Sequence, residues 1–198
     1  MPTATKIMII RHAEKPPKKG GPPLGVSVDG ANGANMLIVQ GWQRAGALAT
    51  LFAPSRGPLQ SALLATPGTL FACTPDTSSQ RPCDTLAPLS AKLGVAIDQS
   101  FGEGDTTPMI ARAMACQGTV LICWEHKHIQ RITAQIPRRD AQPPDTYLWP
   151  GSRFDVVFVF DLDGDAYRFS QVPELLLAGD IATPIDLRAG APAADDDA

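Results

Sequence analysis

Histidine and arginine side chains stand just after apolar runs of this sequence, where they could act together in one site. Each follows one of three runs: Arg11 and His12 come after residues 7–10, Arg81 after 70–73, and His126 after 119–124. A neutral imidazole is nucleophilic near neutral pH and can take up a phosphoryl group. Arginine guanidinium groups match the oxygens of such a group two at a time. If the four side chains meet, they suit phosphoryl transfer through a histidine.

The elements that must position these side chains are predicted from hydrophobic patterning. The three apolar runs are continuous and rich in β-branched residues, which favours strands buried on both faces of a parallel sheet. Helix patterns lie between and after them: one follows Gly41, one ends at Gly94, one begins at Pro108 and one ends at Pro137. This alternation predicts an α/β fold, a three-layer α/β/α sandwich with a mostly parallel central sheet. The ends of parallel strands share one edge, which would bring the four side chains together.

Three further segments complete the expected organisation. Residues 155–160 and 167–170 flank an Asp-Gly-Asp turn and predict a C-terminal β-hairpin at the edge of the sheet. The segments 15–35 and 138–152 are rich in glycine or proline and long for connections, so we expect functional lids or mobile excursions. One domain is expected over residues 1–188, followed by a disordered acidic tail over 189–198.

Composition excludes several classes of protein. The 198 residues carry a net charge of -3, and Asp195, Asp196 and Asp197 account for it, so binding to nucleic acid is not expected. No apolar run approaches the length of a membrane span, so no association with a membrane is expected. The four cysteines lack C-x-x-C spacing, which indicates reduced thiols and a cytoplasmic protein. The sequence does not indicate an oligomeric state.

Four motifs resemble those of a known family, in the same order along the chain. Arg11-His12-Ala13-Glu14 resembles the R-H-G/A signature of the histidine phosphatase (phosphoglycerate mutase-like) superfamily. Residues 41–49 resemble its G-x-x-R-A-x-x-L-A helix, residues 81–85 its R-x-x-x-T segment, and residues 126–129 its second histidine. The matches together span residues 6–132, about two thirds of the chain.

The resemblance implies a role for each of the four basic residues. His12 would be the nucleophile that takes up the phosphoryl group, and Arg11, Arg81 and His126 would clamp its oxygens. Neither a metal ion nor a cofactor is implied. The implied activity is that of a metal-independent phosphohydrolase, a phosphatase that acts on a phosphomonoester, either a small molecule or a phosphoprotein, through a phosphohistidine.

The acid that would protonate the leaving group is less clearly marked. The resemblance points to Glu103, and Asp105 and Glu125 are alternatives. Four further residues are expected to bind substrate: Glu14, Lys15, Thr74 and His128. Thr74 stands where the family usually has serine, and His128 is one of two residues that replace small residues after the second histidine.

Two other functions are open for the same fold. One is a phosphate-binding, regulatory module with weak turnover, and the other is a phosphomutase. The chain is shorter than typical mutases and has no obvious cap insertion, which favours a phosphatase.

Two competing site patterns are judged weaker. Asp161-Leu-Asp163-Gly164 resembles the nucleophile motif of haloacid dehalogenase-type phosphatases, but only 34 residues follow it, too few for the domain those enzymes need. A zinc site from Glu125, His126 and His128 with His12 is disfavoured, because a helix is expected to begin near residue 128.

Arg44 lies on the helix that follows Gly41. Its spacing from the apolar residues of that helix favours an exposed cation on the opposite face, and the alternative is that Arg44 or Arg56 takes the place of Arg81 in the site.

Overall fold

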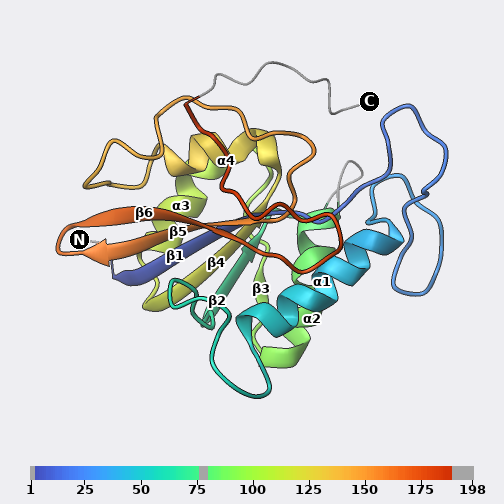
Figure 1. Ribbon diagram of the computed structural model, residues 1–198, viewed down its shortest axis with the longest axis horizontal. Helices are drawn as coiled ribbons and strands as arrows, with labels where there is room; N and C mark the ends of the chain where they lie inside the picture. Colours follow the sequence, from blue (N-terminus) through green and yellow to red (C-terminus); the bar gives the residue numbers. More distant parts are fainter. Residues whose placement is uncertain (1–2, 76–79, 189–198) are drawn as a thin grey trace.

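A six-stranded sheet forms the centre of the protein. The computed structural model describes residues 3–75 and 80–188, and the strand order is β3-β2-β4-β1-β5-β6 (Figure 1). The strands are β1 (Ala4–Arg11), β2 (Thr69–Ala72), β3 (Ile97–Asp98), β4 (Gly118–Trp124), β5 (Val156–Asp163) and β6 (Ala166–Pro173). The helices within the described residues are α1 (Val39–Phe52), α2 (Arg81–Leu93), α3 (Thr106–Met114) and α4 (His126–Thr133). The predicted tail, 189–198, lies outside them.

The sheet is parallel on one side and antiparallel on the other. Strands β1, β4, β2 and β3 pair in parallel, whereas β5 pairs antiparallel with both β1 and β6. The predicted α/β sheet and its C-terminal hairpin at the edge are therefore confirmed. Strand β3 was not predicted, because two residues show no periodicity.

Successive side chains of β1 point into two separate cores, as the pleat of a strand requires. Ile7 and Ile9 belong to the core that contains Met109 of α3 and Ile129 of α4. Met8 and Ile10 belong to a second core, with Leu48 and Phe52 of α1 and Leu86 and Leu89 of α2. Figure 1 shows α3 and α4 on one side of the sheet and α1 and α2 on the other. A strand buried on both faces explains why the run 7–10 is uniformly apolar.

Two helix ends matter for the site. Helix α2 begins at Arg81 with a proline in its first turn, and it ends at Gly94, whose φ of 66° is left-handed. Helix α4 begins at His126, two residues before the expected start near 128, because the Glu125 carboxylate caps it by accepting a hydrogen bond from the Lys127 N–H (2.8 Å). His126 and His128 therefore both lie in the first turn of a helix.

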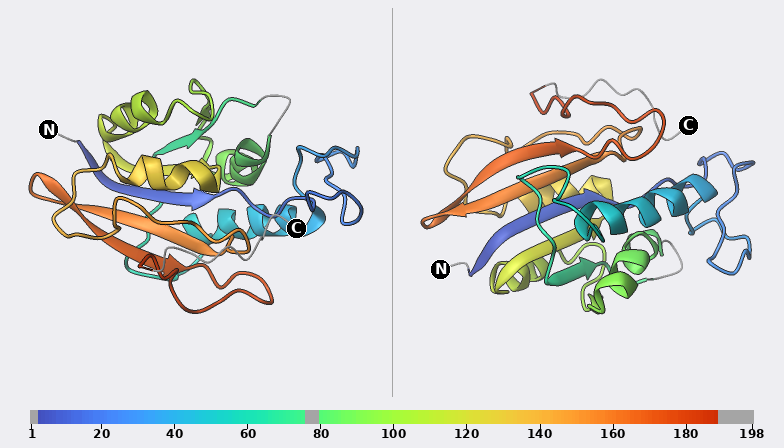
Figure 2. Two further views of the ribbon diagram at one scale, coloured as in Figure 1. Left: turned by 90° about the horizontal axis from the view of Figure 1, so that it is seen from above. Right: turned by 60° about the horizontal axis from the view of Figure 1, so that its bottom comes forward.

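The segment 15–35 is fastened to the body of the protein. Figure 2 shows it projecting beside the N-terminal end of α1. The Val26 N–H donates to the Leu37 carbonyl (2.8 Å), and the Trp42 indole N–H donates to the Val26 carbonyl (2.8 Å). The Gly33 N–H donates to the Gly25 carbonyl (2.9 Å), a close approach that a Cβ on Gly25 would block. The segment is therefore a hydrogen-bonded lobe.

The segment 138–152 covers the face of β5. Tyr147 and Trp149 are buried there, and the Trp149 ring lies 4.7 Å from that of Phe158 between centroids. Both long segments thus pack on the fold instead of forming detached excursions.

The Asp161-x-Asp163-Gly164 pattern belongs to the hairpin. Because β5 runs antiparallel to β1, its final residues lie at the sheet edge opposite to His12. Asp161 pairs with Lys6, and Asp163 accepts a hydrogen bond from Arg168 (2.7 Å). None of the helices in residues 3–75 and 80–188 combines the length and apolar character needed to cross a bilayer.

Two glycine substitutions should have opposite effects on stability. Gly94→Ala places a Cβ at a left-handed position and should lower the free energy of unfolding by about 1 kcal/mol. Gly46→Ala, within α1 at an exposed position with open space around the added Cβ, should raise it by about 0.5–1 kcal/mol. Urea denaturation of the two variants and the wild type measures both values, and equal effects at the two positions would contradict the helix ends described above.

Candidate functional site

The pairing of β1 with β4 brings the two predicted histidines to one edge of the sheet. Arg11 lies opposite Trp124, and the His12 N–H donates to the Trp124 carbonyl (3.0 Å), so the two chains stay paired just past the strands. One side-chain nitrogen or oxygen from each of His12, Glu125 and His126 lies within 4.8 Å of the other two. We call these three residues the histidine group.

His12 is held as a neutral imidazole. Its Nδ1 lies 2.7 Å from the Ala13 carbonyl, which can only accept, so Nδ1 carries the proton and Nε2 carries the lone pair. The ring is fully buried, and Nε2 has no hydrogen-bond partner among residues 3–75 and 80–188. Burial, together with the positive charges of Arg11 and Arg81, holds the pKa of His12 well below its ordinary value. His12 therefore has an available nucleophilic nitrogen at neutral pH.

Glu125 contacts both the second histidine and the helix that it caps. Its Oε1 lies 3.0 Å from Nδ1 of His126, while Oε2 accepts the hydrogen bond from Lys127. Burial alone would raise the pKa of Glu125, but the contacts with His126 and with the Lys127 N–H lower it to about 2. Glu125 is therefore ionised in the unliganded protein.

The other two predicted acids lie farther from His12. Glu103 pairs with His128, whose Nε2 is 3.1 Å from the carboxylate, and these two form a second group with Glu125 within 4.8 Å. Asp105 accepts a hydrogen bond from the Gly102 N–H (3.0 Å) and belongs to neither group. Glu125 is thus the only member that the two groups share.

The split between the groups also bears on the zinc alternative. His126 belongs to the histidine group and His128 to the second, because both lie in the first turn of α4 and not on one face of a strand. The four-residue set considered for zinc is not assembled as one cluster among the described residues.

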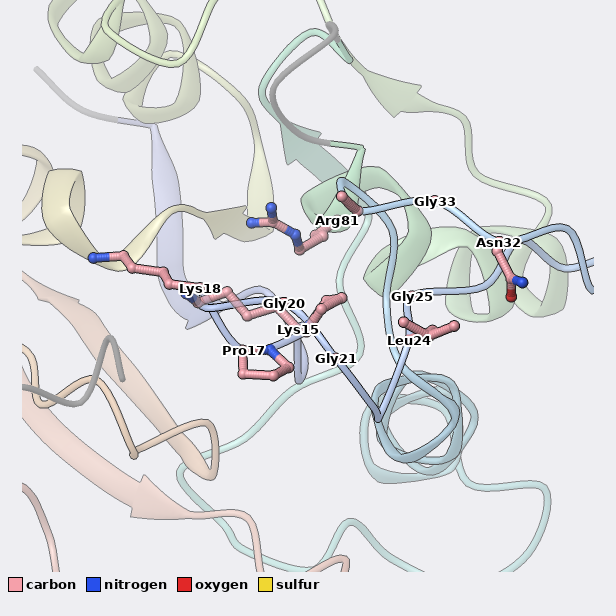
Figure 3. Close-up of a pocket in the computed structure, with 12 residues that line it drawn as sticks. Lys15, Pro17, Lys18, Gly20, Gly21, Leu24, Gly25, Asn32, Gly33 and Arg81 are labelled. Atoms are coloured by element: carbon pink, nitrogen blue, oxygen red, sulfur yellow. The ribbon is translucent and has the colours of Figure 1, made fainter.

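Arg81 joins the site from the N-terminal end of α2. Burial lowers the pKa of Arg81, and the nearby negative charges of Glu125 and Glu103 oppose this effect. Arg81 also lines a hollow together with Lys15 and Lys18 from the segment 15–35, and Figure 3 shows this arrangement. Two predicted residues, Arg81 and Lys15, therefore border one space beside the strand ends.

Arg11 is held by the end of the segment 138–152 and the residues that follow it, a contact that the sequence did not indicate. Its Nη1 donates to three backbone carbonyls, those of Pro150 (3.3 Å), Gly151 and Arg153 (3.1 Å). Its guanidinium carbon lies 3.7 Å from the centroid of the Phe154 ring, a cation–π contact, and the same ring lies 6.2 Å from that of His12. Phe154 thus touches Arg11 and flanks the candidate nucleophile. Its place at the end of a Pro- and Gly-rich loop carried no recognisable signal.

The prediction that Arg44 is an exposed cation is wrong. Its side chain is 3% exposed and forms ion pairs with Glu14 (2.8 Å), Glu174 (2.9 Å) and Asp180 (2.7 Å). Residues 174–180 cover this face of α1, and nothing in the helix pattern could show that. Glu14, predicted to bind substrate, is itself buried and bound to Arg44. Because Glu14 lies two residues after His12, the Arg44 ion pairs fasten the loop that carries the imidazole.

For Glu174, the positive charge of Arg44 does not offset the effect of burial on its pKa. Burial raises its pKa to about 8, aided by the charges of Asp180 and Asp155 and opposed by Arg44. One guanidinium therefore serves three carboxyl groups, and burial favours the neutral form of Glu174.

Thr74 lies outside both groups. Its hydroxyl donates to the Gln99 carbonyl (2.6 Å), and its N–H donates to the Phe101 carbonyl (2.7 Å). These bonds tie the end of β2 to the segment after β3, so in this structure Thr74 fastens a connection.

Comparisons with known proteins support the fold. No protein-family model matches the sequence, and a search of curated proteins found no match. A structure from Escherichia coli, described as a candidate alpha-ribazole-5'-P phosphatase, matches with a TM-score of 0.50 and 12% identity, over 86% of this chain and 96% of that one. A structure from Nakamurella multipartitia, described as a candidate phosphohistidine phosphatase SixA, matches with a TM-score of 0.49 and 17% identity, over 86% of this chain and 96% of that one. A structure described as mycobacterial hydrolase 2 matches with a TM-score of 0.46 and 12% identity, over 84% of this chain and 88% of that one.

The buried acid beside Arg44 should make stability depend on pH. The pKa of Glu174 is raised from an ordinary 4.5 to about 8 on folding, so its contribution to stability is complete below pH 4.5 and is lost as pH rises to about 8. The side chain of the Glu174→Gln variant stays neutral at every pH. The free energy of unfolding of this variant should therefore exceed that of the wild type by at least about 1 kcal/mol at pH 8 and should differ little from it at pH 4. Urea denaturation across this range measures the difference.

Asp84→Asn is the matched control for that experiment. Burial raises the pKa of Asp84 to about 6, against the opposing charge of Arg81, so its stability difference from wild type should develop between pH 4 and 6 and then stay constant. If the free energies of unfolding of Glu174→Gln and the wild type change in parallel from pH 6 to 8, the raised pKa of Glu174 is contradicted.

Proposed function

This chain has the fold of the histidine phosphatase superfamily, and from that premise we propose that it hydrolyses phosphomonoesters through a phosphohistidine on His12, without a metal ion. The observation that carries the proposal is the state of Nε2 of His12, a buried nitrogen with an available lone pair and no hydrogen-bond partner in the part of the chain that the structure describes. It lies at the carboxyl ends of parallel strands, where α/β proteins bind their ligands. Arg81 and His126 lie at the same edge and can bind phosphoryl oxygens.

In the first step, Nε2 of His12 attacks phosphorus and the bond from phosphorus to the ester oxygen breaks. The ring needs no base to activate it, because its proton is already on Nδ1 and bonded to the Ala13 carbonyl. That carbonyl also stabilises the positive charge that the ring gains when the N–P bond forms. Arg81 and His126 bind the phosphoryl oxygens as charge moves onto them.

In the second step, water attacks the phosphohistidine and the N–P bond breaks. The electron pair of that bond returns to Nε2, inorganic phosphate leaves, and the proton of water passes to the carboxylate that protonated the alcohol in the first step. The product takes up that proton before it leaves, as dihydrogen phosphate, so the protein returns to its starting state with an unmodified imidazole and an ionised carboxylate.

We assign this proton transfer to Glu125. It is the acid that lies within 4.8 Å of both His12 and His126, whereas Glu103 reaches the site through Glu125 and His128. Since Glu125 is ionised in the unliganded protein, its proton arrives with the monoanion of the ester. The negative charge of a bound phosphoryl group raises the pKa of an adjacent carboxyl group and holds that proton on Glu125.

His12→Ala should abolish turnover and leave the fold intact. With an aryl phosphate and excess chelator, phosphate release should fall by at least about three orders of magnitude, as it does when other hydrolases lose their nucleophile. The wild type should retain its rate in chelator and yield an acid-labile phosphoryl adduct that the variant lacks. Circular dichroism confirms folding. Vanadate binding without any turnover by the wild type would instead indicate a phosphate-binding module, and activity removed by chelator would contradict the proposed chemistry.

Leaving groups of different basicity test the role of Glu125. Glu125→Gln should slow hydrolysis of phenyl phosphate by about 100-fold or more, but 4-nitrophenyl phosphate far less, because nitrophenolate leaves without a proton. Gln keeps an oxygen that can cap α4. Glu103→Gln and Asp105→Asn are the matched controls and should change both rates by the same factor. If Glu103→Gln shows the dependence on leaving group instead, the proton belongs to Glu103.

A further inference from the structure

The half-buried ring of Phe154 adjoins two residues of the site at once. Its centroid lies 3.7 Å from the guanidinium carbon of Arg11 and 6.2 Å from the centroid of the His12 ring. The first distance is that of a cation–π contact, and the second lies within the range of packed aromatic pairs. One side chain from a distant part of the sequence therefore packs beside both the candidate nucleophile and the cation that precedes it.

The residues on both sides of Phe154 are fastened, which limits where its ring can lie. Arg153 donates from Nε to the Asp155 carboxylate (2.6 Å) and from Nη2 to the Thr183 carbonyl (2.9 Å). Both Arg153 and Asp155 are buried. The same short loop supplies the carbonyls that hold Nη1 of Arg11. The aromatic ring and the guanidinium group are thus fixed against each other by one piece of backbone.

Several charged or titratable groups surround the His12 ring, from three elements of the fold. Among the described residues they are Arg11 of β1, Arg81 of α2, and Glu125 and His126 at the start of α4. Burial is the largest influence that lowers the pKa of His12, and the charge of Arg11 comes next. The Ala13 carbonyl and Glu125 act in the opposite direction. Phe154 bears on both of the leading influences, because its ring lies beside the imidazole and against the guanidinium group.

We propose that Phe154 is a positioning residue for the phosphoryl transfer: its ring keeps water from one side of His12 and holds the charge of Arg11 beside it, so that Nε2 keeps its lone pair for attack. Phe154 takes no part in the bonds that form and break, and it acts through His12 and Arg11. The inference rests on the proposed function, since it concerns the nucleophile of that same site.

The pH dependence of kcat/KM tests this role, because kcat/KM reports the ionisation of groups in the free enzyme. With 4-nitrophenyl phosphate, the ratio of the kcat/KM of Phe154→Ala to that of the wild type should be about tenfold lower at pH 5 than at pH 7.5, since an imidazole exposed to water takes up a proton in this range. The ionisation of the substrate cancels in this ratio. Phe154→Tyr keeps the aromatic face and should retain the wild-type pH dependence. Phe169→Ala is the control: Phe169 is a half-buried ring of β6 that packs on Phe158, and its removal should leave the pH dependence unchanged.

Proton NMR follows the same ionisation without any turnover. The chain has three histidines, so the signal of His12 is identified by its loss in His12→Ala. The midpoint of its titration should lie at higher pH in Phe154→Ala than in the wild type. In Phe154→Tyr and Phe169→Ala it should stay at the wild-type value.

Two results would overturn the inference while leaving phosphatase activity in place. One is a loss of kcat/KM in Phe154→Ala by the same factor at both pH values, with the His12 titration unmoved. The other is an equal change of pH dependence in Phe169→Ala, which would trace the effect to a general loss of packing. If the wild type does not hydrolyse the ester, the proposed function fails, and the NMR titration alone decides the inference. If circular dichroism shows that Phe154→Ala is unfolded, Phe154→Leu takes its place, with the same direction of change expected in both measurements.

Discussion

The parallel pairing of β1 with β4 determines where almost every chemical group of this protein lies. Its register carries one bond past the strands, from the His12 N–H to the Trp124 carbonyl. A slip of one residue would turn Ile7 and Ile9 into the wrong core and separate His12 from Glu125. The two apolar cores and the site therefore depend on the same set of backbone hydrogen bonds.

From this base, His12 is secured on two sides by charged residues. On one side Arg44 binds Glu14, the residue that ends the His12 loop, and is itself bound by Glu174 and Asp180. On the other side the carbonyls of residues 150–153 and the Phe154 ring hold Arg11. Buried charges are costly unless they are paired, so these contacts fix the loop in one geometry. The imidazole between them stays neutral because it is surrounded by protein and by positive charge.

The sequence alone predicted the sheet, its hairpin and the residues at the strand ends, because buried parallel strands leave continuous apolar runs and the site residues follow them directly. It could not predict that Arg44 is buried and bound to three acidic side chains. The partners Glu174 and Asp180 lie about 130 residues away, and helix periodicity describes only one element at a time. Phe154 was missed for the same reason. The first turn of α4 was placed two residues late, because capping by Glu125 depends on a side-chain contact that a pattern of isoleucines does not reveal.

The ion pairs of Arg44 also have a consequence for the order in which the protein can mature. The loop that carries His12 is near the start of the chain, whereas two of the three carboxyl groups around Arg44 come from residues 174 and 180. During synthesis, β1, α1 and β4 can assemble before those residues exist, but Arg44 then lacks two of its three carboxyl partners and its helix face is uncovered. The nucleophile is consequently among the first residues made and among the last to be locked in place. A nascent chain holds an unfinished site until the segment after β6 folds back over α1.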